Sequence, residues 1–297
     1  MMAARLQKII AQAGLCSRRE AEEWILAGRV KVNDKTATVG ESADPDADRI
    51  TVDGRPLQTR AERWYLAVNK PAGYTTSLKD RHAEHLITEL IPKRFGRVFP
   101  VGRLDRDTSG LILLTNDGYL AHRLMHPSYH VAKIYEVWIK GVPGRNHVAR
   151  IEHGIELDDG VARPQSIQII RSDKAHDRTL LRMTLTEGKK REIRRIFEAI
   201  GHPVLELRRV AFGPLSVEGL DEGRSRPLSH REVKTLYSLV EKTPARYVMH
   251  RRDDDIDEIS AGTARHRDKR PVRAKIPAAR PGNSVGHSSR NPGRTHR

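Results

Sequence analysis

The fold is decided by the stretch Gly102-Arg103-Leu104-Asp105-Arg106-Asp107-Thr108-Ser109-Gly110-Leu111-Ile112-Leu113-Leu114-Thr115-Asn116-Asp117-Gly118. Its apolar run at 111–114 predicts a buried strand, and Asn116-Asp117-Gly118 predicts a turn after it. The polar loop before the strand carries Asp105. Because a buried strand anchors this loop, we expect the carboxylate to be held rigidly, which suits catalysis. An ordinary surface turn that leads into a core strand is the alternative.

The composition points to a polyanionic partner. The chain of 297 residues has 54 Lys and Arg against 38 Asp and Glu, which gives a formal charge of +16. Nucleic acid and an anionic membrane surface both fit this charge. No window approaches about 18 consecutive apolar residues, and no signal peptide is recognisable, so we expect a cytoplasmic protein without a membrane span. The single cysteine, Cys16, excludes an internal disulfide and a cysteine-based zinc cluster and is expected to be buried.

Residues 3–60 predict a compact module of two short helices followed by a small sheet. Ser17 and Glu20 have the spacing of a capping box at the start of the second helix. The runs 30–32 and 36–39 flank a turn and predict a hairpin. This arrangement resembles the S4 RNA-binding domain, although a solvated pair of amphipathic helices is the alternative. The basic residues expected to contact RNA phosphates are Arg18, Arg19, Arg29 and Lys31.

Residues 63–240 predict a domain of the α+β class. Strands outnumber helices here and do not alternate with them strictly. The predicted strands are 65–69, 111–115, 134–139, 166–171 and 180–185. The predicted helices are 85–90, 119–125, 191–199 and 231–239.

Four segments of this domain resemble the RsuA/RluB/RluE/RluF family of rRNA pseudouridine synthases. The most specific is the Asp105 stretch, and the other three are Asn69-Lys70-Pro71-Ala72-Gly73, Lys133-Ile134-Tyr135-Glu136-Val137 and Glu187-Gly188-Lys189-Lys190-Arg191-Glu192-Ile193-Arg194-Arg195-Ile196-Phe197. The resemblance implies an S4 domain in front of a catalytic domain built on a mixed, mainly antiparallel sheet. It implies no cofactor. Segments 197–205 and 207–214 look most like the RluB branch, which acts on large-subunit rRNA, whereas the small-subunit branch differs around Phe-Gly-Pro.

The resemblance also implies roles for single residues. Pseudouridine formation breaks the bond between uracil N1 and ribose C1′, turns the base and joins C5 to C1′. Asp105 would attack as a nucleophile or remove a proton from the sugar, and the sequence does not choose between these routes. It must be ionised in both, and Arg194 is the cation expected beside it, with Arg195 as the neighbouring alternative. Tyr135 would stack on the target base and carry protons.

Three more residues are expected to contact RNA in the catalytic domain. Arg103 would hold a phosphate or help displace the base, since a uridine in structured RNA has to be flipped out. Lys70 lies in the Lys-Pro turn, and Leu205 would line the uracil pocket, with a plain core leucine as the alternative. His122 and His126 have the spacing of a metal pair, but the matching glutamate and a third ligand are missing, so no metal is expected.

Residues 241–297 predict a disordered basic tail that adds salt-sensitive affinity for RNA, or serves only solubility. The sequence as a whole predicts a monomeric bacterial-type rRNA pseudouridine synthase whose partner is large-subunit rRNA or its assembly intermediates. A synthase acting on 16S rRNA and a non-catalytic RNA-binding ribosome assembly factor are the alternatives. A membrane-surface protein is disfavoured, because the tail has no apolar face.

Overall fold

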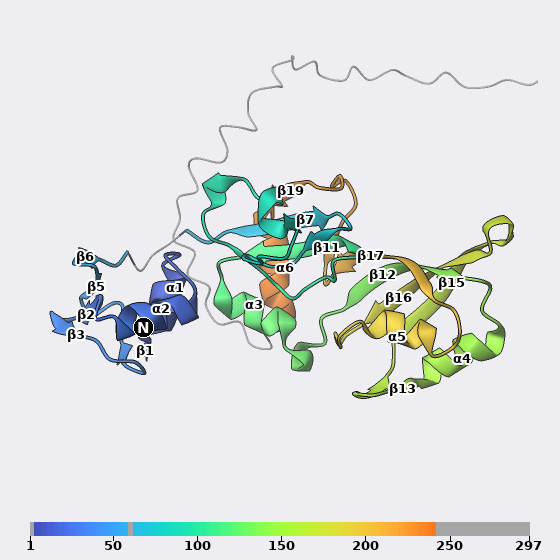
Figure 1. Cartoon of the computed structure of the whole chain (residues 1–297), viewed down its shortest axis with the longest axis horizontal. Coiled ribbons are helices and arrows are strands. Elements are labelled where there is room, and N and C mark those ends of the chain that lie inside the picture. The colour runs from blue at the N-terminus through green and yellow to red at the C-terminus, as the bar shows by residue number, and fades with distance from the viewer. Residues whose placement is uncertain (1–2, 59–61, 242–297) are drawn as a thin grey trace, which may run out of the picture. The chain divides into compact units, whose positions relative to one another are not determined.

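The computed structural model describes residues 3–58 and 62–241. Figure 1 shows the helices and strands of both stretches along the chain. The tail predicted for 241–297 lies outside the described residues, apart from Glu241. None of the helices in the described ranges combines the length and the apolar character that a membrane span needs.

The N-terminal stretch contains the two predicted helices, α1 (Leu6–Gln12) and α2 (Arg18–Leu26). The Ser17 hydroxyl accepts the Glu20 amide at 3.1 Å, and the Glu20 carboxylate accepts the Ser17 amide at 3.4 Å. The predicted capping box is therefore confirmed. It satisfies donors that the first turn of a helix leaves free.

A small antiparallel sheet completes this module, in the order β3-β2-β5-β6. Cys16 is 2% exposed within the core between helices and sheet, as predicted. The hairpin joins β2 to β3, and β3 is shorter than the predicted strand 36–39. The strands of this sheet are β2 (Val30–Val32), β3 (Lys35–Thr36), β5 (Ile50–Val52) and β6 (Arg55–Pro56). The strands β1 (Ala4–Arg5) and β4 (Ser42–Ala43) pair with each other separately.

Within residues 62–241, nine strands form one sheet. Its order is β15-β16-β12-β17-β11-β7-β19, with β10 paired to β11 and β18 to β17. In this sheet β11 and β17 run parallel, and the other pairings in the described residues are antiparallel. The predicted mixed, mainly antiparallel α+β fold is confirmed. The bounds are β7 (Tyr65–Lys70), β10 (Phe99–Pro100), β11 (Thr108–Thr115), β12 (Lys133–Lys140), β15 (Ser166–Asp173), β16 (Arg178–Leu185), β17 (Val204–Phe212), β18 (Leu215–Ser216) and β19 (Ser225–Pro227).

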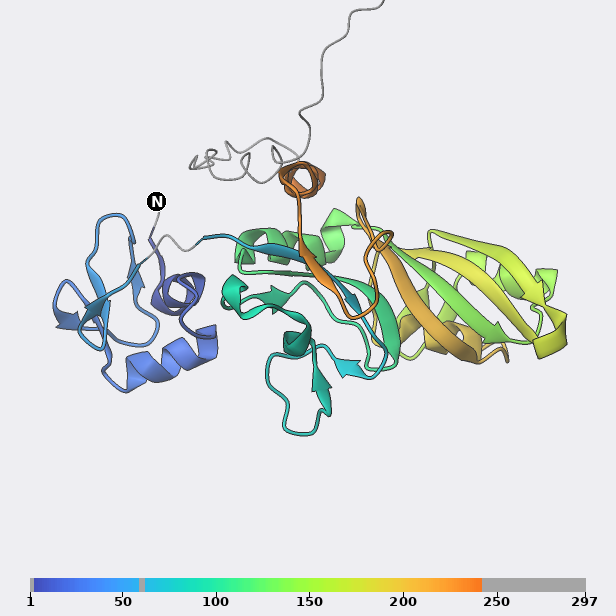
Figure 2. The same cartoon turned by 90° about the horizontal axis from the view of Figure 1, so that it is seen from above.

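Helices cover both faces of this sheet. α3 (Gly118–Met125) and α6 (His230–Val240) pack on Leu111 and Leu113 of β11. α4 (Arg145–His153) and α5 (Glu192–Glu198) pack on the side that carries Leu207 of β17. Because Leu207 is in register with Thr108, and side chains alternate along a strand, Leu111 points to the other face. Figure 2 shows α6 and α5 on opposite sides of the sheet.

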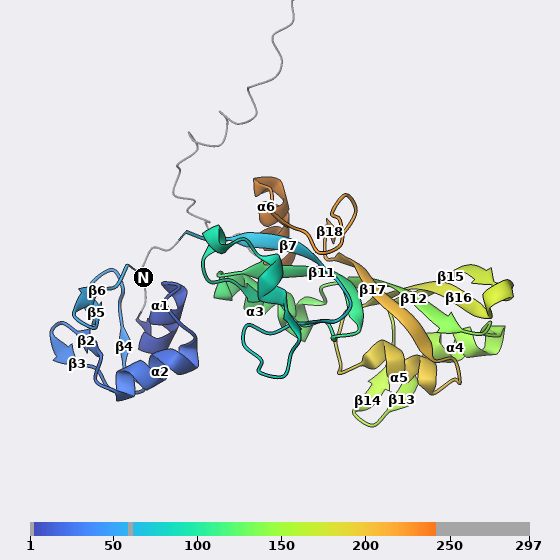
Figure 3. The same cartoon turned by 45° about the horizontal axis from the view of Figure 1, so that its top comes forward.

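The structure of this domain differs from the prediction in several elements, among them the missed helix α4. The helix predicted at 85–90 is instead a short strand, β9 (His85–Leu86), which pairs with β8 (Tyr74–Thr75), followed by the 3₁₀ helix Ile87–Leu90. The segment is too short for a stable α-helix, and Pro92 follows it closely. The sequence reading also missed β17, which runs between β11 and β12 (Figure 3).

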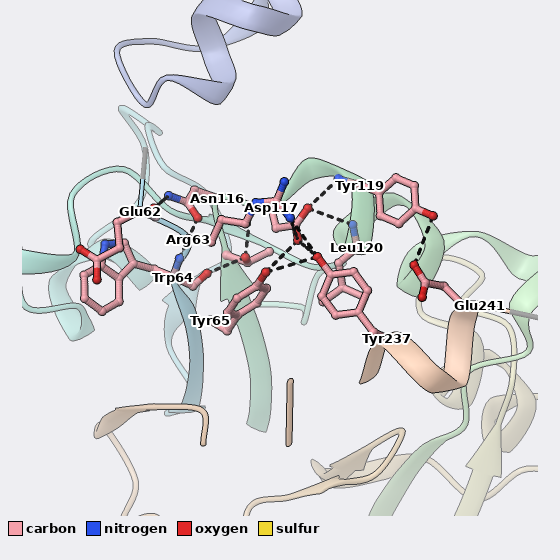
Figure 4. Close-up of polar contacts among 11 residues, drawn as sticks. Glu62, Arg63, Trp64, Tyr65, Asn116, Asp117, Tyr119, Leu120, Tyr237 and Glu241 are labelled. Atoms are coloured by element: carbon pink, nitrogen blue, oxygen red, sulfur yellow. Dashed lines mark hydrogen bonds and ion pairs between the residues drawn. The ribbon is translucent and has the colours of Figure 1, made fainter. Parts of the chain in front are cut away.

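A buried polar cluster fastens α3 and α6 to the sheet. The Asp117 side chain caps α3 by accepting the amides of Tyr119 and Leu120 at 3.1 and 3.2 Å. Its other oxygen accepts the hydroxyls of Tyr65 and Tyr237, the former at 2.8 Å (Figure 4). The predicted turn at 116–118 is therefore the start of a helix, and its aspartate joins three elements.

Candidate active site

Hydrogen bonds on both sides of Asp105 pin its loop. The Thr76 hydroxyl donates to the Leu104 carbonyl at 2.8 Å and accepts the Leu104 amide at 3.3 Å. On the other side, the Thr108 amide donates to the Asp105 carbonyl at 3.1 Å. The Asp105 carboxylate itself makes no hydrogen bond or ion pair with any described residue. A fixed backbone thus presents a carboxylate whose oxygen atoms are available to a substrate.

The Lys-Pro turn that begins at Lys70 is hydrogen-bonded to this loop. Lys70 is fully buried, and its ammonium donates to the carbonyls of Pro71, Tyr74 and Arg106 at 2.9, 2.8 and 3.4 Å. Burial lowers the pKa of Lys70 to about 8, against the attraction of Asp107 and Asp105. The prediction that Lys70 contacts RNA is wrong, because its charge is enclosed and its donors are used within the protein.

Asp105 lines a cavity of about 740 Å³. Arg103 and Tyr135 also line it, so three of the predicted site residues meet there. Its size falls within the usual range of small-molecule sites. Arg103 is exposed and makes no hydrogen bond or ion pair within the described ranges, which leaves its guanidinium free at the cavity. The apolar part of the lining includes Leu124, Leu185, Ile193, Leu207 and Phe212.

Three neighbouring strands set the floor of the cavity. Tyr135 on β12 is in register with Arg209 on β17, and Arg209 is in register with Gly110 on β11. A Cβ atom at Gly110 would lie 2.2 Å from the Arg209 carbonyl oxygen, so only glycine allows β11 and β17 to come so close. This contact ties the Asp105 loop, which leads into β11, to the strand that carries Arg209.

Arg194 does not make the predicted pair with Asp105. Its Nη2 lies 2.8 Å from the Asp107 carboxylate and donates to the Asp107 carbonyl at 3.1 Å. Arg194 is not among the residues that line the cavity. The helix α5 therefore directs this arginine to the residue two positions beyond the predicted one. Arg195, the alternative, pairs instead with Asp159 at 2.8 and 2.9 Å.

Leu205 is also misassigned. It is 50% exposed and does not line the cavity. The register between β12 and β17 shifts between Trp138 and Ile139, which leaves Leu205 as the extra residue of a β-bulge. The leucine of this strand that faces the cavity is Leu207.

A cluster of acidic and basic groups forms another wall. Burial and the nearby Glu187 raise the pKa of Glu192 to about 7. One oxygen of Glu192 accepts the Lys189 amide at 3.0 Å, and the other is buried without a partner. Burial, followed by the charge of Arg209, lowers the pKa of Lys133. The sequence reading assigned no role to Glu192 or Lys133.

The predicted RNA-binding residues of the N-terminal module are all exposed. Arg18 and Arg19 occupy the first positions of α2, and Lys31 lies on β2. Arg29 is already engaged, because its guanidinium donates to the Asp53 carboxylate at 2.9 and 2.6 Å. RNA contact by these residues stays a prediction.

The sequence also did not predict Thr108 and Arg209, two further polar residues of the cavity. Each is 2% exposed, and the Thr108 hydroxyl and the Arg209 Nη2 have no hydrogen-bond partner. Strand alternation along 204–212 could have placed Leu207 and Arg209 on one face. Among the described residues, no group of three or more His, Cys, Asp or Glu side chains is placed to hold a metal ion.

The arrangement of fold and cavity agrees with the comparisons to known proteins. Residues 64–199 match the RNA pseudouridylate synthase family, and residues 4–48 match the S4 domain. The chain belongs to the RNA pseudouridylate synthase family, whose reaction is the isomerisation of uridine in RNA, and it carries an N-terminal S4 domain.

Individual relatives cover most of the chain. The chain is 40% identical to the ribosomal large subunit pseudouridine synthase B of Bacillus subtilis, over 80% of this chain and 97% of that protein. It is 41% identical to an uncharacterized RNA pseudouridine synthase of Aquifex aeolicus, over 81% and 96%. A crystal structure of a pseudouridylate synthase matches with a TM-score of 0.57 and 30% identity, over 78% of this chain and 99% of that one.

Proposed function

We propose that this protein isomerises a specific uridine of large-subunit rRNA to pseudouridine, with Asp105 as the catalytic residue. The observation that carries the proposal is the unpaired Asp105 carboxylate in a cavity that Tyr135 and Arg103 also line. We propose further that it acts as a monomer. We assign the activity to the cytoplasm, where bacterial rRNA is made.

Each residue has a part that its position supports. The Asp105 carboxylate attacks C1′ or removes a proton from the sugar, and either route leaves the electron pair of the N1–C1′ bond on the base. The Tyr135 ring offers a stacking surface to the base. Arg103 has a free guanidinium for a phosphate of the flipped nucleotide. After the base turns, C5 bonds to C1′ while the Asp105–C1′ ester bond breaks or, in the other route, Asp105 returns the proton to the sugar. The C5 proton is then lost and N1 gains a proton.

Arg194 acts through the loop instead of on the substrate. Its pairing with Asp107 joins α5 to the residue two positions after Asp105. We therefore propose a positioning role for Arg194. The buried Lys70 ammonium also interacts electrostatically with both Asp107 and Asp105.

The choice of large-subunit rRNA rests on the relatives. The matched protein of Bacillus subtilis is named for the large ribosomal subunit, as is one of Pseudomonas aeruginosa that is 38% identical over 78% of this chain. The S4 domain supports an additional RNA contact, for which Arg18, Arg19 and Lys31 are exposed. Arg29 takes part only if RNA phosphate replaces Asp53.

Mapping of pseudouridine in rRNA tests this proposal. Carbodiimide modification and primer extension are applied to rRNA from cells that lack the gene, and to cells rescued with the wild type or Asp105→Asn. We expect one large-subunit site to disappear and to return only with the wild type. Arg208→Met, on an exposed residue of β17, serves as a rescue control.

Other results would overturn specific parts of the proposal. Loss of a site in 16S rRNA would keep the reaction and reject the large subunit. An unchanged map would favour a non-catalytic assembly factor. Rescue by Asp105→Asn would reject Asp105 as the catalytic residue.

A further inference from the structure

Arg209 is a buried arginine without a counter-ion. It is 2% exposed, and it makes no ion pair in the described part of the chain. Its Nε donates to the Leu111 carbonyl at 2.7 Å, and its guanidinium carbon lies 5.3 Å from the centre of the Phe212 ring. Its Nη2 has no hydrogen-bond partner. A buried charge with unused donors is costly, so the folded protein keeps it at the expense of stability.

The position of this charge points to the substrate. Arg209 lines the same cavity as Asp105, and on the adjacent strand β12 it is in register with Tyr135. Thr108 lines the cavity as well, and its hydroxyl is a second buried polar group without a partner. Vacant polar groups in an otherwise partly apolar cavity fit a flat base with carbonyl oxygens, because each vacant donor then finds an acceptor.

The reaction creates the charge that Arg209 is suited to meet. When the N1–C1′ bond breaks, the electron pair stays on the base, and its negative charge spreads over N1 and the carbonyl oxygens O2 and O4. A fixed cation in a site shielded from water stabilises such a charge strongly. Asp105 cannot do this, since it is itself an anion.

We propose that the Arg209 guanidinium donates a hydrogen bond to a carbonyl oxygen of the flipped target uracil and stabilises the negative charge of the base while it is detached from the sugar. This inference rests on the proposed function, because it assigns a second catalytic group to the same cavity. Lys133 adds positive charge to the same wall, but its ammonium already donates to the carbonyls of Val131 and Thr186 at 3.1 and 3.4 Å.

A double-mutant cycle, in which one change is made in the protein and the other in the substrate, tests the hydrogen bond between Arg209 and the uracil. The wild type and Arg209→Met are compared in single turnover on an rRNA fragment with the mapped uridine, and on fragments with 2-thiouridine or 4-thiouridine in its place. Sulfur accepts hydrogen bonds more weakly than oxygen. We expect Arg209→Met to slow the reaction of the normal RNA about 10²- to 10³-fold. One thio substitution should slow the wild type and have no further effect on the variant.

Several readouts separate catalysis from a structural role. RNA affinity and the thermal midpoint are measured for each variant, and Arg208→Met is the matched control on the exposed neighbouring residue. If Arg209→Met does not fold, Arg209→Lys is used instead, and its thio effect should be smaller than that of the wild type, because lysine keeps the charge but not the planar guanidinium. Thio effects that are equal in the wild type and the variant for both oxygens would overturn the proposal. A wild type that forms no pseudouridine would instead reject the proposed function.

Discussion

The close approach of β11 and β17 at Gly110 makes Gly110→Ala the sharpest test of how the fold builds the site. Gly110 has a φ of +106°, and an added Cβ would lie 2.2, 2.7 and 2.9 Å from the Arg209 carbonyl oxygen, amide nitrogen and carbonyl carbon. These are backbone atoms of a central strand, so they cannot turn away as a side chain would. The substitution therefore adds both backbone strain and a clash.

The magnitude follows from these two contributions. A non-glycine residue at positive φ costs about 1–2 kcal/mol. Overpacking against a rigid neighbour costs a further 1–3 kcal/mol or so. Gly73→Ala isolates the first contribution, because Gly73 has a φ of +93° and no atom within 4 Å of an added Cβ. We expect Gly110→Ala to lower the free energy of unfolding by about 2–5 kcal/mol, and Gly73→Ala by about 1–2 kcal/mol.

Equilibrium unfolding in guanidinium chloride measures both variants, with the midpoint and slope compared to the wild type. Activity is measured at a temperature where Gly110→Ala is folded. Separation of the strands would move Asp105 relative to Arg209, and a displacement of about 1 Å can cost roughly 10²-fold in rate. If Gly110→Ala were as stable as Gly73→Ala and fully active, the argument from close packing would be refuted.

Three further changes test other contacts. Asp117→Ala should lower the free energy of unfolding by about 3–5 kcal/mol, because it removes the cap of α3 and an acceptor of buried tyrosine hydroxyls. A thermal midpoint within about 3 °C of the wild type would contradict this. Burial raises the pKa of Glu192 to about 7 from an ordinary value of 4.5, so its protonated form favours the fold, and stability should fall as pH rises from about 4.5 through 7. Glu192→Gln should flatten this part of the stability profile, and an unchanged profile would reject the assignment. Arg194→Gln and Asp107→Asn should each slow catalysis, and their double variant should be no slower than the worse single one; additive losses would mean that the pair does not act as a unit.

Alkaline stability supplies a fifth test. Burial raises the pKa of Tyr65, and the charge of Asp117 raises it further. The unfolded chain ionises this tyrosine near pH 10 while the folded protein keeps it neutral, so the free energy of unfolding should decrease above about pH 10. Tyr65→Phe should weaken that decrease, as followed by unfolding at several pH values. An equal decrease in both proteins would show that other groups cause it.

Local sequence patterns predicted the elements whose signals are strong. The apolar run 111–114 is fully buried, and the capping box of Ser17 and Glu20 forms as expected. The central strand β17 escaped because Glu206, Arg208 and Arg209 interrupt its apolar pattern. Only the tertiary structure explains those charges, since Arg208 is exposed and Arg209 faces the cavity.

The sequence predicted the site residues whose positions follow from the backbone of a motif. It did not predict which partners individual side chains contact. Asp105, Tyr135 and Arg103 meet in one cavity as expected. Lys70 and Arg194 were assigned from their places in the motifs, but burial and a difference of two residues along the loop decide their actual partners. A β-bulge places Leu205 outside the cavity, and this bulge depends on the pairing of two strands that are far apart in the chain.

The most direct test of the central claim is release of the C5 hydrogen from RNA. Purified wild type and Asp105→Asn are incubated with rRNA labelled with tritium at uridine C5, and the tritium released into water is counted. The account predicts release by the wild type, and none by Asp105→Asn although it binds the RNA with unchanged affinity. Release by Asp105→Asn at the wild-type rate would contradict it.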